Sequence, residues 1–302
     1  MSSPAVRPIS PEPVVERALR VVTDPADPDS PDVGDDGLDA RPSGPPPYLS
    51  PSSASTFEQC ARRWKFRYID RLPDPPGDKA LVGTFVHRVL EELLARDVAE
   101  RSVASARKIA GLVWPEIEAD PAYIDLGLEV DEGRRLRWDA WRLIEAYFAM
   151  ERPESVDVVE REQRIECELG DVPFVGVVDR VERRDGKLVV TDYKTGRAPA
   201  ARFEADRLHQ VQLYAAALDA TGERPDTARL LYLGSRSIEA EVTDESLDAA
   251  VSSIGSTWVR INDALDRGDY PPRTGPLCGW CPYTQHCAEG RVELERRYGP
   301  AV

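Results

Sequence analysis

The segment 176–197, with the sequence GVVDRVERRDGKLVVTDYKTGR, is the feature that most constrains the fold of this chain. It has two runs rich in β-branched residues on either side of Asp185-Gly186, a dipeptide typical of a tight hairpin turn. If the two strands pair symmetrically about that turn, Asp179 lies directly opposite Asp192. Directly opposed side chains have Cβ atoms only about 5 Å apart, and like charges placed there repel each other. The hairpin therefore needs something that offsets this repulsion.

Strand alternation places both aspartates on the same hairpin face as Lys194. That face also carries apolar side chains and is expected to face the core: Val177, Val181, Leu188 and Val190. The opposite face carries Arg180, Glu182, Thr191 and Tyr193. A divalent metal ion between the carboxylates is one explanation for the charges. The alternative is an ion triad in which Lys194 neutralises both aspartates, and a bulge would move Asp179 to the other face.

The order of Asp179 on one strand and Asp192-Tyr193-Lys194 on the next resembles the PD-(D/E)xK nuclease signature, in the GxxDR…DYKTG form of RecB-like nucleases. The resemblance implies that the two aspartates and the Tyr193 carbonyl bind Mg²⁺ or Mn²⁺. It also implies that Lys194 orients or activates the attacking water. The first motif reads Val178-Asp179 rather than Pro-Asp, a departure that RecB-like members also have.

Two other segments agree with this family in order and spacing. The sequence GTFVH, which ends at His87, opens an amphipathic helix, and the resemblance implies that His87 is a metal ligand. Without the resemblance, a histidine here is more often a hydrogen-bonded core residue. Gln210 and Tyr214 lie one helical turn apart and match the family's QxxxY motif, which lines the active site and helps position DNA. Glu160 and Glu162 share a strand face near the place where the family often has a further acidic residue, and the residues alone do not choose between them or exclude a solvated face.

The cysteines form a second pattern. Three of the five are spaced C-x2-C-x5-C: Cys278, Cys281 and Cys287. This spacing alone predicts zinc, with His286 or Cys60 as the fourth ligand, whereas an odd cysteine count without a secretory signal argues against disulfides. AddB-type nuclease domains and the CRISPR-associated iron–sulfur exonucleases have one cysteine before the nuclease core and three after it. That resemblance implies that Cys60 and the three C-terminal cysteines hold a [4Fe–4S] cluster that clips the chain ends together. Cys167 falls in an expected strand beside Ile165, which predicts a small buried hydrophobe.

Composition sets the limits of the domain. Residues 1–47 hold eleven of the 26 prolines and predict a disordered acidic tail, so the nuclease domain is expected to span residues 48–302. No secretory signal and no apolar run of about 18 residues occurs, which predicts a cytoplasmic protein outside the membrane.

The net charge of −15 argues against a protein that simply coats DNA. A local basic patch interleaved with aromatic residues nevertheless suits a single strand and predicts DNA binding by Arg62, Arg63, Lys65 and Arg67. The alternative is a solvated helix face whose aromatic neighbours lie in the core.

Periodicity predicts an α/β fold with a mixed central sheet after a helical subdomain, as in the restriction-endonuclease-like core of PD-(D/E)xK nucleases. A first helix is expected from a cap at Ser52 or Ser53 to about Ile69. Further helices are expected near 81–98, 101–118, 133–151, 206–220 and 244–265, and strands near 157–168, 173–183, 187–194, 228–234 and 237–243.

Together the residues and the resemblance predict a deoxyribonuclease that depends on Mg²⁺ or Mn²⁺. The resemblance implies linear or single-stranded DNA as substrate, degraded from an end during repair, recombination or foreign-DNA processing. The chain contains no Walker motif, so a helicase activity would come from a separate partner. The alternatives are a non-catalytic DNA-binding or scaffold subunit that keeps the fold, and a zinc-stabilised adaptor.

Overall fold

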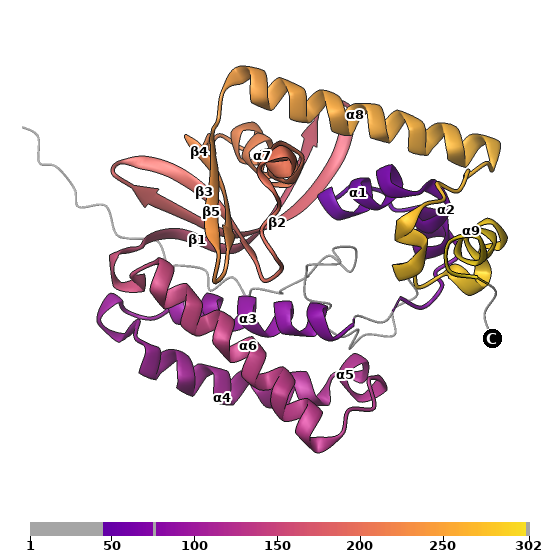
Figure 1. The fold of residues 1–302 in the computed structure, drawn as a ribbon. Coiled ribbons are helices and arrows are strands. Elements are labelled where there is room, and N and C mark those ends of the chain that lie inside the picture. Colours follow the sequence, from indigo (N-terminus) through magenta and orange to yellow (C-terminus); the bar gives the residue numbers. More distant parts are fainter. Residues whose placement is uncertain (1–44, 75–76, 300–302) are drawn as a thin grey trace, which may run out of the picture.

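The computed structural model describes residues 45–74 and 77–299 and has a five-stranded mixed sheet at its centre (Figure 1). The strands lie in the order of the chain: β1 (Asp157–Leu169), β2 (Val172–Arg184), β3 (Lys187–Lys194), β4 (Thr227–Tyr232) and β5 (Arg236–Glu241). Neighbouring strands are antiparallel except β3 and β4, which are parallel. Parallel neighbours need a crossover connection, and helix α7 (Glu204–Ala220) supplies it. The expected mixed α/β architecture is confirmed.

Helices cover both faces of the sheet (Figure 1). One layer consists of α3 (Asp78–Leu94), α4 (Val103–Ala119), α5 (Pro121–Asp125) and α6 (Val130–Met150). The other face is covered by α7, α8 (Asp244–Arg267) and α1 (Pro51–Gln59). The first and last helical segments lie side by side: α2 (Ala61–Trp64), a π-helical turn (Lys65–Ile69) and α9 (Ala288–Tyr298). Short 3₁₀ turns occupy Val98–Glu100, Pro153–Ser155, Ala201–Phe203, Pro276–Trp280 and Thr284–His286.

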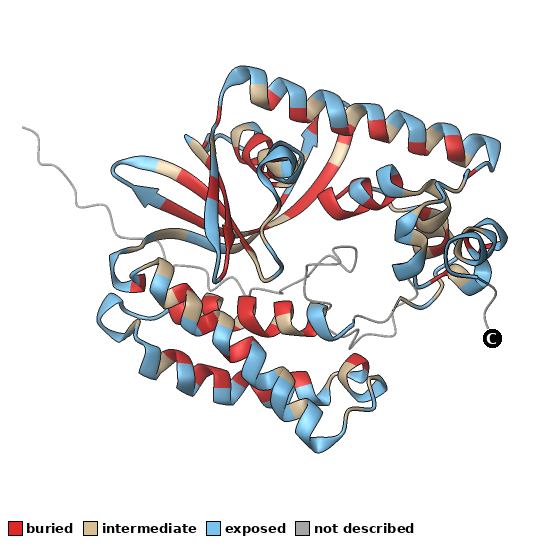
Figure 2. Cartoon of the chain, in the orientation of Figure 1, coloured by how far each residue is buried: buried red, intermediate tan, exposed pale blue. Residues whose placement is uncertain are grey.

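Because of these two layers, the hairpin is buried on both faces (Figure 2). Val181 and Val190 belong to the core beneath α7 and α8, as expected for their face. The side chains of the opposite face are also buried, at 0–4% exposure, since α3 and α6 cover them: Arg180, Glu182, Thr191 and Tyr193. The expectation that Val177 joins the core face is wrong. Val177 is half-buried, and its neighbour Val178 packs into the core with α7, so the strict alternation changes between Val178 and Val181.

The first helix differs from expectation. Ser50, not Ser52 or Ser53, caps α1, because its hydroxyl accepts a hydrogen bond of 3.1 Å from the Ser53 amide. Ser53 instead accepts a hydrogen bond of 2.9 Å from the Trp64 indole. The expected continuous helix to Ile69 is interrupted at Cys60, whose backbone is extended at φ −167° and ψ 111°. Helix α9 has no counterpart among the expected elements.

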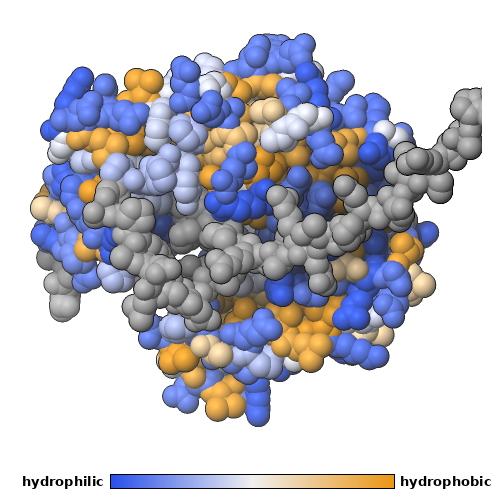
Figure 3. All heavy atoms as spheres, turned by 180° about the vertical axis from the view of Figure 1, so that it is seen from behind, coloured by the Kyte–Doolittle hydropathy of each residue, from blue (hydrophilic) through white to orange (hydrophobic). Residues whose placement is uncertain are grey.

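Two expectations concern the chain as a whole. The tail predicted for residues 1–47 lies outside the described part of the chain except for its last three residues. No helix within 45–74 or 77–299 combines the length and the hydropathy that a membrane crossing requires. The reverse face of the molecule carries hydrophobic residues in separate groups among hydrophilic ones (Figure 3).

Candidate active site

The candidate site begins where the β2–β3 hairpin stops pairing regularly. The register runs from Arg184 opposite Lys187 to Arg180 opposite Thr191, as symmetric folding about the turn predicts. Beyond that pair, the Tyr193 amide donates a hydrogen bond of 2.5 Å to Oδ2 of Asp179. A side chain therefore takes the place of a backbone partner at the end of the ladder.

His87 reaches Asp179 from the helical layer. It lies on the buried face of α3, with Phe85, Val86 and Leu90, and its side chain is 8% exposed. Its Nδ1 is 3.4 Å from Oδ1 of Asp179. Burial alone would lower the pKa of His87, but the charge of Asp179 and the hydrogen bond to it outweigh burial and raise that pKa to about 9.

Glu162 is the acidic residue that sequence reasoning could not select. His87, Glu162 and Asp179 each offer a ligand atom, and these atoms all lie within 4.8 Å of one another. Glu160 is exposed. Glu162 lies between residues paired with Arg180 and Val178, so it is level with Asp179, and its φ of +43° is rare for a glutamate. Strand alternation assumes regular backbone, so no pattern in the sequence reveals this local turn.

The three residues fit a hard divalent ion. Burial and the charge of Asp179 raise the pKa of Glu162 to about 8, because two buried carboxylates repel each other. Burial opposes ionisation of Asp179 as well, but the nearby His87 holds the pKa of Asp179 below its ordinary value. A cation between the carboxylates would remove this conflict, and carboxylate oxygens suit Mg²⁺ or Mn²⁺. An imidazole nitrogen is a softer ligand, which the transition ion Mn²⁺ accepts more readily than Mg²⁺.

The remaining candidate catalytic residues form a chain of polar contacts from β3 to α7. Lys194 Nζ lies 3.1 Å from Oδ2 of Asp192 and donates a hydrogen bond of 2.9 Å to Oε1 of Gln210. Gln210 Nε2 donates one of 3.1 Å to the Tyr214 hydroxyl. Asp192 does not belong to the close group of three, but its carboxylate lies beside Lys194 and its charge acts on His87.

Gly176 allows α7 to come this close. A Cβ atom at this position would lie 2.9 Å from Cε1 of Tyr214, a separation that real Cβ atoms do not tolerate. The glycine of the GxxDR pattern therefore has a packing reason, since it makes room for the Tyr214 ring.

The candidate DNA-binding residues lie on α2 and the π-helical turn, and each has a protein partner. Arg62 donates to the Tyr270 carbonyl at 2.8 Å, and Arg63 contacts Gln59. Lys65 pairs with Asp70 at 2.5 Å and Arg67 pairs with Asp74 at 2.9 Å. The aromatic residues between them, Trp64 and Phe66, are buried, as the alternative reading expected.

The four candidate cluster ligands line one cavity between α2 and the C-terminal segment: Cys60, Cys278, Cys281 and Cys287. All five cysteines are free thiols. The Arg273 amide donates to the Cys60 sulfur at 3.4 Å, and the Gly290 amide donates to the Cys287 sulfur at 3.3 Å. Cys167 is half-buried in β1 and packs against the main core, which agrees with a hydrophobic role.

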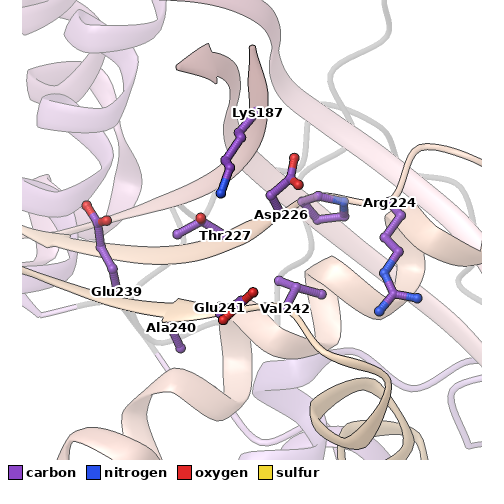
Figure 4. Close-up of a pocket in the computed structure, with 9 residues that line it drawn as sticks. Lys187, Arg224, Asp226, Thr227, Glu239, Ala240, Glu241 and Val242 are labelled. Atoms are coloured by element: carbon purple, nitrogen blue, oxygen red, sulfur yellow. The ribbon is translucent and has the colours of Figure 1, made fainter. Parts of the chain in front are cut away.

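A separate cavity lies at the other end of β3 (Figure 4). Its lining mixes Lys187 and Arg224 with Asp226, Glu239 and Glu241. None of the candidate active-site residues line it, so this cavity is separate from the candidate active site.

Comparisons with known proteins identify the family of this chain. The family model of the PD-(D/E)XK nuclease superfamily matches residues 48–288. The chain is 23% identical over 290 residues to the "Gene 69 protein" of Mycobacterium phage L5, which covers 80% of this chain and 96% of that protein. It is 31% identical over 137 residues to a "CRISPR-associated exonuclease Cas4/endonuclease Cas1 fusion" of Leptospira interrogans, covering 41% of this chain and 24% of the fusion.

Among solved structures, "Crystal structure of SSO0001" is 18% identical, covers 68% of this chain and 95% of its own, and has a TM-score of 0.33. That score is too low for an argument about the fold. The family match spans the described domain from before α1 to the start of α9. The chain therefore belongs to the PD-(D/E)XK nuclease superfamily, and this membership implies a metal-dependent phosphodiester hydrolase that acts on DNA.

Proposed function

We propose that this protein is a RecB-like deoxyribonuclease that uses Mg²⁺ or Mn²⁺ and degrades linear or single-stranded DNA from an end. The observation that carries the proposal is the close grouping of His87, Glu162 and Asp179 beside the Lys194–Asp192 pair. These residues come from α3, β1, β2 and β3, and core packing alone does not require them to meet.

Each side chain has a distinct role in this proposal. The ion would be held by His87, Glu162, Asp179, Asp192 and the Tyr193 carbonyl. When bound, the ion supplies Lewis-acid polarisation of the phosphate and lowers the pKa of the attacking water. Lys194 orients that water and offsets negative charge that develops on the phosphate oxygens.

Gln210 and Tyr214 keep Lys194 in place. The Lys194 ammonium has a long flexible stem, and the hydrogen bond of 2.9 Å to Gln210 restricts it. Tyr214 in turn binds Gln210 and is packed against Gly176. Helix α7 therefore supports Lys194, the residue that is proposed to orient the attacking water.

The test is cleavage of end-labelled single-stranded DNA by full-length protein purified without oxygen, with Mg²⁺ or Mn²⁺, beside Asp192→Ala. Metal-dependent cutting that the variant lacks supports the proposal, and the ladder of products gives the polarity. Equal inactivity of both proteins, with normal DNA binding, would instead favour a non-catalytic subunit of a complex with a separate helicase.

We also propose that the four cysteines bind a [4Fe–4S] cluster that has a structural role. All four cysteines line one cavity, which supports a shared metal centre. One cysteine before the nuclease core and three after it is the arrangement of the iron–sulfur exonucleases that the chain resembles, and this arrangement supports the cluster over zinc.

The proposed DNA-binding residues lie near the cysteine cavity, where the two ends of the domain meet. Arg62 and Arg63 line the cysteine cavity. Three of the four basic residues are paired with acidic side chains: Arg62 with Glu289, Lys65 with Asp70 and Arg67 with Asp74. DNA contact by these three requires exchange of a carboxylate for a phosphate, so Arg63, whose partner is the neutral Gln59, is the better candidate within the patch. Repair, recombination and foreign-DNA processing are the pathways in which such an enzyme would act.

A further inference from the structure

A buried network of charges lies beneath the candidate site. Arg180 is completely buried, and its two terminal nitrogens donate hydrogen bonds of 2.9 and 3.0 Å to the two carboxylate oxygens of Glu151. It also forms an ion pair of 2.7 Å with Glu182. Arg229 shares both carboxylates, through a short contact with Glu151 and one of 3.5 Å with Glu182. The network joins β2 and β4 to the residue that follows α6.

Stability alone is a weak reason for such a network. Removing charges from water costs several kcal/mol for each ion, and apolar residues of similar volume are often as stabilising. The network therefore calls for a second role, and its position indicates one. Arg180 follows Asp179 directly in β2 and belongs to the last regular pair of the β2–β3 ladder, opposite Thr191.

Arg180 also holds Tyr193. Its Nη1 donates a hydrogen bond of 2.8 Å to the Tyr193 hydroxyl, and its guanidinium carbon lies 5.3 Å from the centre of that ring. Tyr193 in turn contacts two candidate metal ligands, Asp179 and His87. Its amide binds Asp179, and its ring meets the His87 ring edge to face, with centroids 5.8 Å apart.

These contacts form one continuous path. Glu151 fixes Arg180, Arg180 fixes the Tyr193 ring, and Tyr193 fixes Asp179 through its amide and His87 through its ring. The path lies where the regular pairing between β2 and β3 has ended, so side chains contribute to the geometry between these two strands. Groups that orient metal ligands from behind typically change affinity or activity about 10–100-fold when removed.

We propose that Arg180, held by Glu151, is a positioning residue that sets the metal-binding geometry of Asp179 and His87 through Tyr193. It contacts neither the ion nor DNA. The inference rests on the proposed function, because it assumes that these two residues bind a divalent ion.

The test measures Mn²⁺ binding to full-length protein by calorimetry, with thermal unfolding recorded beside it. Tyr193→Phe removes the hydroxyl but keeps the ring against His87, so we expect a folded protein with Mn²⁺ affinity reduced about tenfold. Arg180→Met should show at least the same loss. Arg229→Met is the matched control, since Arg229 shares Glu151 and Glu182 but, among the described residues, makes no hydrogen bond to Tyr193. It should lower stability and leave Mn²⁺ affinity unchanged.

Wild-type affinity in Tyr193→Phe would overturn the inference. The inference would also be overturned if Arg229→Met, which lowers stability, lowered Mn²⁺ affinity as well. In that case the network would affect the metal site only through the stability of the fold. If Arg180→Met does not fold, Tyr193→Phe against Arg229→Met decides alone. A wild-type protein that binds Mn²⁺ but cuts no DNA overturns the proposed activity only, whereas one that binds no Mn²⁺ overturns both.

Discussion

Lys194 at the end of β3 donates a hydrogen bond of 2.9 Å to Gln210 on α7, so the crossover between the two parallel strands also supports the candidate catalytic lysine. A catalytic ammonium works only if it points in one direction, and its own stem does not ensure this. Gln210 and Tyr214 of the QxxxY pattern therefore position Lys194, in addition to any contact that they make with DNA.

Replacing Gln210 tests this support. Gln210→Ala should reduce kcat about tenfold with little change in KM, because Lys194 loses its partner while substrate contacts remain. Gln210→Glu keeps an acceptor oxygen and should retain more activity. Steady-state cleavage of a labelled strand measures both. A Gln210→Ala enzyme whose KM rises while kcat stays constant would show that Gln210 binds substrate and does not position Lys194.

Gly176→Ala should destabilise the protein by about 1–3 kcal/mol, because the new methyl group would meet the Tyr214 ring. Gly196→Ala is the matched control, since nothing lies within 4 Å of a Cβ there and the position has no positive φ. Urea unfolding of both variants measures the difference. Adding Tyr214→Ala to Gly176→Ala should relieve the overlap. Equal stability of Gly176→Ala and Gly196→Ala would disprove the packing argument.

Glu162 and Glu160 form a natural matched pair on one strand. Glu162→Gln should weaken Mn²⁺ binding about tenfold or more, because it removes one of three grouped ligands. Glu160→Gln changes an exposed side chain and should bind as wild type does. Calorimetric titration compares them. Equal loss in both variants would mean that net charge, and not ligation, attracts the ion.

Glu151 predicts how stability depends on pH. Burial opposes its ionisation, but Arg180 and Arg229 outweigh burial and lower the pKa of Glu151 from 4.5 to about 2. A lowered pKa contributes stability that is fully present above about pH 4.5 and is lost as the pH falls through about 2. The contribution is at most about 3 kcal/mol, and the raised pKa of the buried Glu182 acts in the opposite direction.

The measurement is the free energy of unfolding from about pH 7 to about pH 3, in wild type and Glu151→Gln. Stability of the wild type should fall toward acid more steeply than that of the variant. The variant should also be less stable near neutral pH, since two arginines lose a charged partner. Parallel curves for the two proteins would show that other carboxylates govern the acid response.

The cysteine proposal predicts a loss of iron. Cys60→Ser should reduce the amounts of bound iron and sulfide and make the protein unfold at a lower temperature, because Cys60 is the one proposed cluster ligand that comes from the first helices. Cys167→Ser is the control and should keep its iron, since Cys167 lies in β1 outside the cavity. Elemental analysis after purification without oxygen gives the result. Zinc in stoichiometric amount and no iron would reject the cluster.

The sequence allowed the hairpin to be predicted well, for a physical reason. A two-residue turn at Asp185-Gly186 leaves one symmetric register, so the pairing from Arg184 to Arg180 follows from counting. Near Glu162 counting fails, because a residue at φ +43° breaks the alternation and carries the carboxylate to a position that no pattern shows. The burial of Arg180 was equally hidden, since it depends on helices from another part of the chain.

The helix boundaries follow the same rule. Caps depend on one hydroxyl finding one amide, and Ser50 does so although Ser52 and Ser53 offer the same chemistry two and three residues later. At Cys60 the extended backbone interrupts the helix, and the sulfur accepts a hydrogen bond from the amide of the distant Arg273. Contacts between distant segments thus account for the differences from expectation.

The interrupted helix at Cys60 also imposes an order on biosynthesis. The cavity that Cys60 lines is completed only by Cys287, near the other end of the domain. At ordinary translation rates, roughly tens of seconds separate the synthesis of Cys60 from that of Cys287. The proposed clip would therefore close, and the proposed cluster would take up its iron, only after the whole domain has been synthesised.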